Sequence, residues 1–190
     1  MIESVEKYGG FYVGRYETGN LSKENAVIRK GNTDIGKQTW YAMYRKCKNL
    51  NNKNTNVETG MIWGNQWDRT LMWLIESGNK SKEEICKDST SWGNYSNAEF
   101  TYIDSNGNIT TKYRAIVLPT GSSEYTKANN IYDLAGNVWD WTMARGDRNR
   151  YYRGGSASYS GDRYYSSWYG NMPSVTSAGD IGCRAMLYIK

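Results

Sequence analysis

The sequence predicts an α+β domain, and three observations favour this class. Two segments with helical spacing lie in the first half of the chain, strand-like segments dominate the second half, and no regular alternation of strand and helix joins them. A length of 190 residues fits one domain with its own core. We therefore expect a single domain over residues 1–190, belonging to a longer protein as its C-terminal domain.

The first elements are a strand and a loop. Residues 10–17 are rich in β-forming residues between turn residues, which predicts a strand. Residues 31–38 carry the GxxxxGK skeleton of a phosphate-binding loop. Gln38 stands where a Ser or Thr would hold magnesium, and no helix-opening pattern follows directly on a buried strand. We expect an ordinary loop.

Apolar residues at helical spacing predict two amphipathic helices, joined by a polar link over residues 51–56. The apolar face of the first is Trp40, Met43, Tyr44, Cys47 and Leu50, with Arg45, Lys46 and Lys48 outward. The second is expected from Gln66 to Ser77, with Asn65 as its N-cap, Asp68 three residues later and Gly78 as its stop. Its apolar face is Trp67, Leu71, Leu74 and Ile75.

Residues 91–96 are expected to form a loop in which aromatic side chains pack. A hairpin is expected after it, in the middle of the chain. Strand-like residues 100–103 and 109–113 flank the sequence DSNGN, in which Asn106-Gly107 is a strong turn signal. The same five residues resemble a calcium-binding loop (D-x-N-x-N). No Glu follows at the spacing that such a loop needs, so we expect a turn.

Composition excludes several functional classes. The absence of histidine rules out a Ser-His-Asp triad, a Cys-His pair, HExxH and any zinc site that needs histidine. Cys47, Cys86 and Cys183 lie far apart, which excludes a CxxC motif, and an odd number cannot be fully paired. This leaves the redox compartment open. The net charge of +5 is modest and no long basic run exists, so nucleic-acid binding is not expected.

No segment suggests membrane insertion or export. The longest apolar runs fall well short of the roughly 20 residues that span a bilayer. Residues 1–8 lack the apolar region of a signal peptide. We expect any export to be directed by something outside this sequence.

Three motifs in the last sixty residues carry a family resemblance. Residues 130–142 read NIYDLAGNVWDWT, which resembles the N-x-x-D-x-x-G-N-V-W-E-W signature of the formylglycine-generating-enzyme (sulfatase-modifying-factor) family. Residues 153–156 read RGGS, and residues 182–184 read GCR where the family has GFR. The resemblance implies a C-type lectin-type fold, a compact α+β domain with small twisted antiparallel sheets whose first and last strands pair.

The cysteines of the family's enzyme are missing. That enzyme oxidises a sulfatase cysteine with two cysteines that follow RGGS shortly, whereas residues 157–162 here read ASYSGD. Cys183 occupies the Phe position of GFR, where we expect a buried apolar side chain and not a nucleophile. We therefore expect no enzymatic activity and no catalytic residues, with a formylglycine-generating-type oxidase as the disfavoured alternative.

The composition changes near residue 145. From there on the chain resembles a second branch of this fold, the variable proteins of diversity-generating retroelements. From residue 145 to residue 189 there is no Lys and no Glu. The basic residues there are Arg145, Arg148, Arg150, Arg153, Arg163 and Arg184, and the acidic ones are Asp147, Asp162 and Asp180. Replacing adenines in an Asn codon can yield Tyr, Ser, Asp, Gly, Arg or Asn, and also His, which is absent here, but never Lys or Glu.

The resemblance implies that residues 145–189 are a variable region that adenine-directed mutagenic reverse transcription diversifies. Trp168 cannot come from an Asn codon, so it is either fixed scaffold or the product of another template codon. A non-diversified lectin-like structural domain is the remaining alternative.

The chemistry of this segment is that of a binding surface. Tyr offers a large rigid contact, Ser, Gly and Asn adapt their hydrogen bonds, and Arg adds bidentate and stacking contacts. The expected ligand-binding residues are Arg148, Asn149, Arg150, Tyr151, Tyr152, Ser158, Tyr159, Ser160, Asp162, Arg163, Tyr164, Tyr165, Ser166, Trp168, Tyr169 and Asn171. The alternative is a Tyr-rich core, because paired tyrosines in a strand place one ring on each face.

The expected partner is a protein or glycan on a host cell or another surface. We expect the domain to be attached to a larger phage or cell-surface protein, on a phage tail or a bacterial surface. No cofactor is required; the one candidate is a structural calcium ion at Asn137 and Asp140. The alternative is that these two side chains tie their loop to backbone N–H groups.

Overall fold

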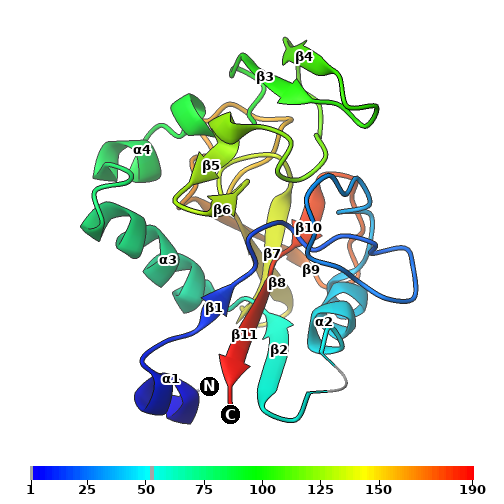
Figure 1. Cartoon of the computed structure of the whole chain (residues 1–190), viewed down its shortest axis with the longest axis vertical. Coiled ribbons are helices and arrows are strands. Elements are labelled where there is room, and N and C mark those ends of the chain that lie inside the picture. The colour runs from blue at the N-terminus through cyan, green and yellow to red at the C-terminus, as the bar shows by residue number, and fades with distance from the viewer. Residues whose placement is uncertain (1, 52–53) are drawn as a thin grey trace.

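A computed structural model describes residues 2–51 and 54–190 and confirms the α+β class. The strands of its two main sheets are β1 (Tyr12–Val13), β2 (Val57–Met61), β7 (Trp139–Arg145), β8 (Asn149–Arg153), β9 (Tyr169–Pro173), β10 (Ile181–Cys183) and β11 (Ala185–Ile189). One sheet has the order β1-β11-β2 and the other the order β10-β7-β8-β9 (Figure 1). The chain thus leaves one sheet and enters the other between β10 and β11.

The first and last strands pair, as expected. β1 lies antiparallel to β11 with Tyr12 opposite Leu187, and the two ends of the chain lie close together in Figure 1. The strand expected at residues 10–17 is shorter, because the chain leaves the sheet at Gly14. Beyond this point it turns inward and buries Glu17 completely.

The C-terminal segment forms two strands that are divided at Arg184. β10 pairs with β7 in parallel, with Cys183 opposite Trp141, whereas β11 pairs antiparallel with β1 and β2. The parallel pair departs from the expectation of antiparallel sheets alone. It places the side chain of Arg184 in the interior between the two sheets.

The described residues form four α-helices, where two were expected. They are α1 (Ile2–Tyr8), α2 (Trp40–Lys48), α3 (Gly64–Glu76) and α4 (Lys82–Cys86). Helices α2 and α3 are the predicted ones. The sequence signal for α4 was missed: Ser81 Oγ accepts from the Glu84 N–H at 3.1 Å, and a Glu84 carboxylate oxygen accepts from the Ser81 N–H at 2.8 Å, which is a capping box.

The predicted start of α3 was wrong by two residues. The helix begins at Gly64 after the N-cap Trp63, and Asn65 lies inside its first turn. Gln66 Oε1 accepts from the Trp63 N–H at 2.9 Å, which satisfies an amide at the helix end. The helix ends as predicted: Gly78 has a φ of +69°, a conformation that favours glycine.

The central hairpin is confirmed as β3 (Phe100–Ile103) and β4 (Ile109–Lys112). Asp104 Oδ1 accepts from the N–H groups of Asn106 and Asn108, at 2.8 and 2.9 Å, so the DSNGN sequence forms the expected turn. A small sheet of β5 (Lys127–Ala128) and β6 (Ile131–Tyr132) follows.

The remaining segments are mostly loops. Residues 31–38 form a loop, as expected. Residues 91–96 also contain the end of a 3-10 turn, Thr90–Trp92, with the rings of Trp92 and Tyr95 buried. Residues 52 and 53 of the expected polar link lie outside the described residues. None of the described helices is long and apolar enough to cross a membrane.

Two apolar clusters form the core. The strands of the main sheets lie between helices α3 and α2 (Figure 1). Helix α3 contributes Trp67, Leu71 and Leu74 to one cluster. Helix α2 contributes Trp40, Met43 and Cys47 to the other, which also contains Trp139, Trp141, Tyr152, Ile181 and Cys183. Both predicted helix faces therefore pack as their spacing indicated.

Arg184 joins the strands of both main sheets to the 130–142 motif through four hydrogen bonds. Its side chain has no exposed surface, and Nε donates to Asp140 Oδ2 at 3.2 Å. Nη1 donates to the Gly14 carbonyl at 2.9 Å, and Nη2 donates to the carbonyls of Tyr132 and Asp133 at 2.9 and 3.0 Å. One guanidinium thus holds the first strand, the 130–142 motif and the last strand together.

We expect Arg184→Met to lower the free energy of unfolding by about 3–5 kcal/mol, because it leaves the buried Asp140 without its cation. Urea unfolding followed by tryptophan fluorescence measures the change. Arg69→Met is the matched control, since Arg69 makes an ion pair with Glu76 on the surface. Equal losses in the two variants would contradict this role for Arg184.

Candidate binding face

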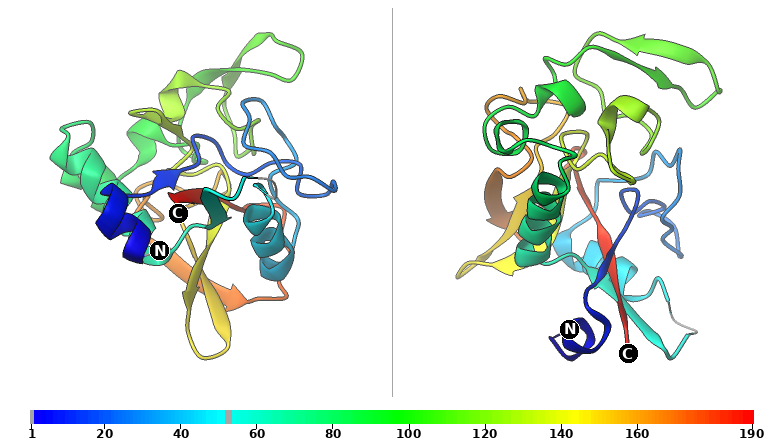
Figure 2. Two further views of the ribbon diagram at one scale, coloured as in Figure 1. Left: turned by 60° about the horizontal axis from the view of Figure 1, so that its bottom comes forward. Right: turned by 60° about the vertical axis from the view of Figure 1, so that its left-hand side comes forward.

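Side-chain alternation along β8 divides the predicted ligand-binding residues between two faces of the sheet. Tyr152 faces α2, with its ring centroid 5.6 Å from that of Trp141. Tyr151 points to the other face, where its ring lies 5.8 Å from that of Tyr169. The β7–β8 hairpin projects from the body of the domain, with β9 beside it (Figure 2).

The larger group is a cluster of five aromatic rings, which we call the aromatic cluster: Trp139, Tyr152, Tyr159, Tyr164 and Trp168. Trp139 is its centre, with ring-centroid distances of 4.9 Å to Tyr152, 5.8 Å to Tyr159, 5.8 Å to Tyr164 and 5.2 Å to Trp168. Trp139 is only 4% exposed, whereas Tyr159 is 40% exposed. The cluster therefore has a buried floor and an accessible rim.

Polar side chains surround this rim. Ser158, Asp162 and Arg163 are exposed and Ser160 is half-buried. The Arg163 guanidinium lies 5.7 Å from the centroid of the Tyr164 ring, within the range of a cation–π contact. Aromatic rings in tilted and edge-on contact, with neighbouring hydrogen-bond donors and acceptors, are the components of a binding surface.

The second group lies on the opposite face of the sheet, and we call it the strand patch: Asn149, Tyr151, Tyr169 and Asn171. Asn149 Nδ2 donates to Asn171 Oδ1 at 2.6 Å, and Tyr169 is 58% exposed. Arg153 borders the patch, with its guanidinium 5.0 Å from the Tyr169 ring and an ion pair of 2.9 Å to Asp68.

Four predicted residues lie outside the strand patch and outside the aromatic cluster with its polar rim, and one of them, Ser166, is buried. Arg148 is exposed in the turn between β7 and β8. The Arg150 guanidinium stacks at 3.8 Å on the ring of Trp40, which is part of α2. Tyr165 is half-buried. The structure thus adds Trp40, Trp139 and Arg153 to the surroundings of the predicted face. Trp139 and Trp141 are two residues apart in a strand, so side-chain alternation could have predicted that their rings lie on the same face of the sheet.

The burial of Tyr152 and Ser166 removes both side chains from the accessible surface. Tyr152 is 8% exposed and Ser166 has no exposed surface. Ser166 Oγ donates to the Ile85 carbonyl at 3.3 Å, and the Ser166 N–H donates to Ser89 Oγ at 2.9 Å. Both residues therefore support the predicted face from the interior of the domain. For Tyr152 this agrees with the alternative of a Tyr-rich core.

The backbone of residues 158–168 is held by residues outside the predicted variable region. The Ser96 N–H donates to the Tyr159 carbonyl at 2.8 Å, and the Ser89 N–H donates to the Gly161 carbonyl at 3.1 Å. The Ser167 N–H donates to the Ile85 carbonyl at 3.2 Å. Because these bonds use the backbone of the loop, a change of side chain at its exposed positions leaves them intact.

Glycines fix the same loop at close approaches. A Cβ at Gly155 would lie 2.4 Å from the Tyr164 carbonyl oxygen, and Gly155 has a φ of +81°. A Cβ at Gly161 would lie 2.7 Å from the Thr90 N atom. Glycine at these positions therefore belongs to the scaffold.

Neither buried thiol has the surroundings of a nucleophile. Cys47 and Cys183 have no exposed surface, which confirms the expectation that both are small core residues. Burial and the neighbouring Cys47 thiol raise the pKa of Cys183 well above its usual value. A protonated, enclosed thiol does not attack an external substrate.

Asn137 does not fit a calcium site. Its Oδ1 already accepts from Asn94 Nδ2 at 2.8 Å and from the Leu118 N–H at 2.9 Å. Its Nδ2 donates to Glu17 Oε2 at 2.7 Å. The structure thus favours the alternative in which the side chain ties its loop to the backbone.

Asp140 faces a cation that the protein itself supplies. Its Oδ2 pairs with Arg184, and only Oδ1 lacks a hydrogen-bond partner among the described residues. One carboxylate oxygen is far from the six to eight oxygens that calcium takes. Among the described residues, no three acidic, Cys or His side chains are grouped as a metal would need. The Arg184 guanidinium supplies the positive charge that faces Asp140 at this position.

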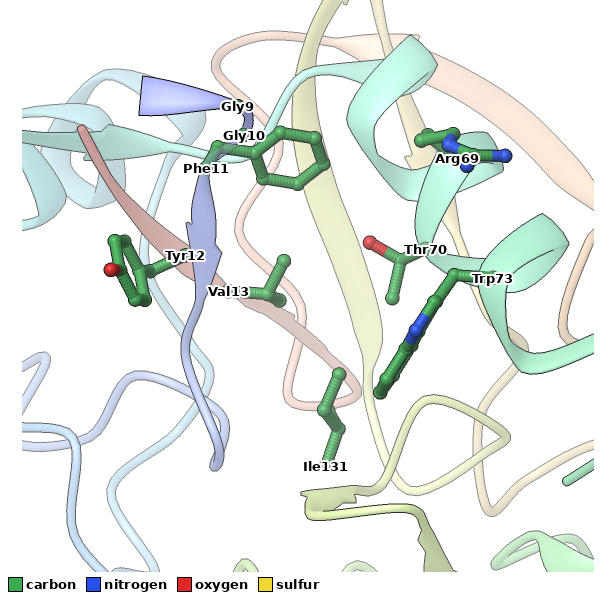
Figure 3. Close-up of a pocket in the computed structure, with 9 residues that line it drawn as sticks. All are labelled: Gly9, Gly10, Phe11, Tyr12, Val13, Arg69, Thr70, Trp73 and Ile131. Carbon is green, nitrogen blue, oxygen red and sulfur yellow. The ribbon is translucent and has the colours of Figure 1, made fainter. Parts of the chain in front are cut away.

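A separate groove of about 450 Å³ lies between β1 and α3. Phe11, Val13, Trp73 and Ile131 give it a largely apolar lining (Figure 3). No residue of the predicted face lines it, and Arg69 at its rim is engaged with Glu76. The groove therefore does not belong to the predicted binding face.

Solved structures share this fold. Treponema denticola variable protein 1 superposes with a TM-score of 0.52 at 15% identity, over 90% of this chain and 77% of that one. PvdO from Pseudomonas aeruginosa gives a TM-score of 0.53 at 14% identity, over 99% and 76%. CarF gives 0.51 at 14% identity, over 82% and 67%.

These similarities confirm the C-type lectin-type fold that the motifs implied. The resemblance to variable proteins and to relatives of formylglycine-generating enzymes is therefore shown at the level of the fold. No family model matches the sequence. No curated protein matches it either.

Stability should fall as the pH rises from about 4 to 7. Burial raises the pKa of Asp140 from 3.8 to about 6, although Arg184 opposes the shift. Burial also raises the pKa of Glu17 and Asp133. A carboxyl group whose pKa is higher in the folded state contributes stability at low pH and loses it through the folded pKa, which for Asp140 amounts to about 3 kcal/mol.

Urea unfolding at several pH values checks this slope, and Asp140→Asn should make it shallower. Exposed groups such as Glu124, whose pKa is lowered by Lys127 and Tyr132, act in the opposite sense but only below about pH 4.5. A free energy of unfolding that rises between pH 5 and 7 would refute the charge balance described for this cluster.

Calcium should leave the melting temperature unchanged, because Asn137 Oδ1 is already bonded and Arg184 neutralises Asp140. Calorimetric scans with excess calcium and with a chelator test this expectation. An upward shift with calcium that Asn137→Asp strengthens would show that a metal does bind there.

Proposed function

We propose that this chain is a non-enzymatic ligand-binding domain with a diversified face centred on the aromatic cluster. The observation that carries the proposal is the separation of backbone from side chains in residues 158–168. Residues outside the region hold the backbone, while Tyr159, Asp162 and Arg163 point to solvent. A face built this way tolerates exchange of its side chains.

The composition of the face supports binding. Tyr and Trp rings provide contact area with little loss of conformational entropy, and the nearby Arg and Asp side chains supply directional polar contacts. The switch from Lys and Glu to Arg and Asp near residue 145 supports diversification through Asn codons. The fold shared with Treponema denticola variable protein 1 is consistent with this function.

The ligand we propose is a protein or glycan on the surface of a host cell. The domain would then act as part of a larger phage-tail or bacterial surface protein. The strand patch would lie at the side of the contact, because the sheet separates it from the aromatic cluster.

Tyr159→Ala and Tyr169→Ala form a matched pair that tests where the face lies. Both side chains are exposed, at 40% and 58%, but they belong to opposite faces. We expect Tyr159→Ala to weaken binding about tenfold or more, and Tyr169→Ala less than threefold. Labelled protein applied to a panel of bacterial cells and a glycan array gives the readout, with circular dichroism as the control for folding.

The proposed face would be wrong if Tyr169→Ala removed binding and Tyr159→Ala did not. Loss of folding in Tyr159→Ala would assign that ring to the core instead.

The gene sequence tests diversification separately. We expect a near-copy of the segment for residues 148–171 close to the gene, differing only at adenines. A purine-ending codon for Ser160, together with no such copy, would refute diversification while leaving the binding function open.

A further inference from the structure

We propose that Cys47 and Cys183 form an intramolecular disulfide when the chain folds in the presence of a small-molecule disulfide oxidant. The two Sγ atoms lie 3.6 Å apart, and the residues are 136 positions apart in the chain. Cys47 belongs to the last turn of α2, and Cys183 is the last residue of β10. The two thiols are in van der Waals contact, and a bond forms when the Sγ atoms approach to about 2.0 Å.

The surroundings of the pair are apolar and closed. Both cysteines belong to the core cluster that contains Met43 and Trp141, and both lack exposed surface. Thr18 Oγ1, at 3.8 Å from Cys47 Sγ, is a neutral neighbour. An external oxidant cannot reach this pair in the folded chain, so the reaction must precede the final docking of α2 on the sheet.

The reaction balances with oxidised glutathione as the oxidant. The thiolate of one cysteine attacks the oxidant's S–S bond, forming a mixed disulfide and releasing one glutathione thiolate. The second cysteine, as its thiolate, displaces the other glutathione. The protein thus loses two electrons and two thiol protons, and the oxidant becomes two thiols.

The cross-link would join α2 to the sheet beneath the aromatic cluster. Cys183 lies opposite Trp141 in the β10–β7 pair, and the Trp141 ring contacts Tyr152. It would leave Cys86 on α4 as the single unpaired thiol of the three cysteines. The disulfide would thereby stiffen the floor of the proposed face.

Refolding from urea with reduced and oxidised glutathione tests the proposal. We expect an intact mass lower by two hydrogens, and a non-reduced peptide that joins Cys47 to Cys183. The oxidised protein should melt roughly 5–15 °C above the reduced one. Cys86→Ser should behave in the same way, whereas Cys47→Ser should lose both effects.

Three results would overturn it: no loss of hydrogens on refolding, a linked peptide that contains Cys86, or a cross-linked protein that melts no higher than the reduced form. Peptide mapping of the wild-type chain decides the first two even if Cys47→Ser fails to fold.

Discussion

The buried guanidinium of Arg184 is the contact on which the rest of the structure depends. It neutralises Asp140 and donates hydrogen bonds to the carbonyls of Gly14, which follows β1, and of Tyr132 and Asp133, at the end of β6. The first strand, the 130–142 motif and the last strand therefore meet at one side chain. The same residue divides the last strand between two sheets. Burial raises the pKa values of Glu17, Asp133 and Asp140, and the positive charge of Arg184 opposes each of these shifts.

The motif residues are therefore scaffold, and the proposed binding face lies between them in the chain. Asp133 accepts from Thr120, Thr126 and Gly121, and Asn137 connects Asn94 to Leu118. These bonds fix the chain that precedes the predicted variable region. A rigid frame with exchangeable exposed side chains is what a diversified binding protein requires, because each new surface must fold without compensation elsewhere.

Local patterns predicted the elements better than they predicted the site. Spacing placed α2 and α3, and Asn106-Gly107 placed the hairpin, because these features depend on near neighbours in the chain. Alternation along β8 indicated that paired tyrosines lie on opposite sides of a sheet, whereas their neighbours on β7 and β9 depend on the strand register, which composition does not contain. The role of Asp140 was also out of reach, since its partner Arg184 is 44 residues away.

The central claim is that exposed loop positions are exchangeable and the motif positions are not. Two libraries of displayed domains test it most directly, each encoding Tyr, Ser, Asp, Gly, Arg and Asn at five positions. One varies the exposed or half-buried loop positions 158, 159, 160, 162 and 163, and the other varies the buried positions 133, 136, 137, 140 and 184. Protease resistance should survive in most members of the first library and in few of the second. Similar losses in both would contradict the separation of scaffold from binding face.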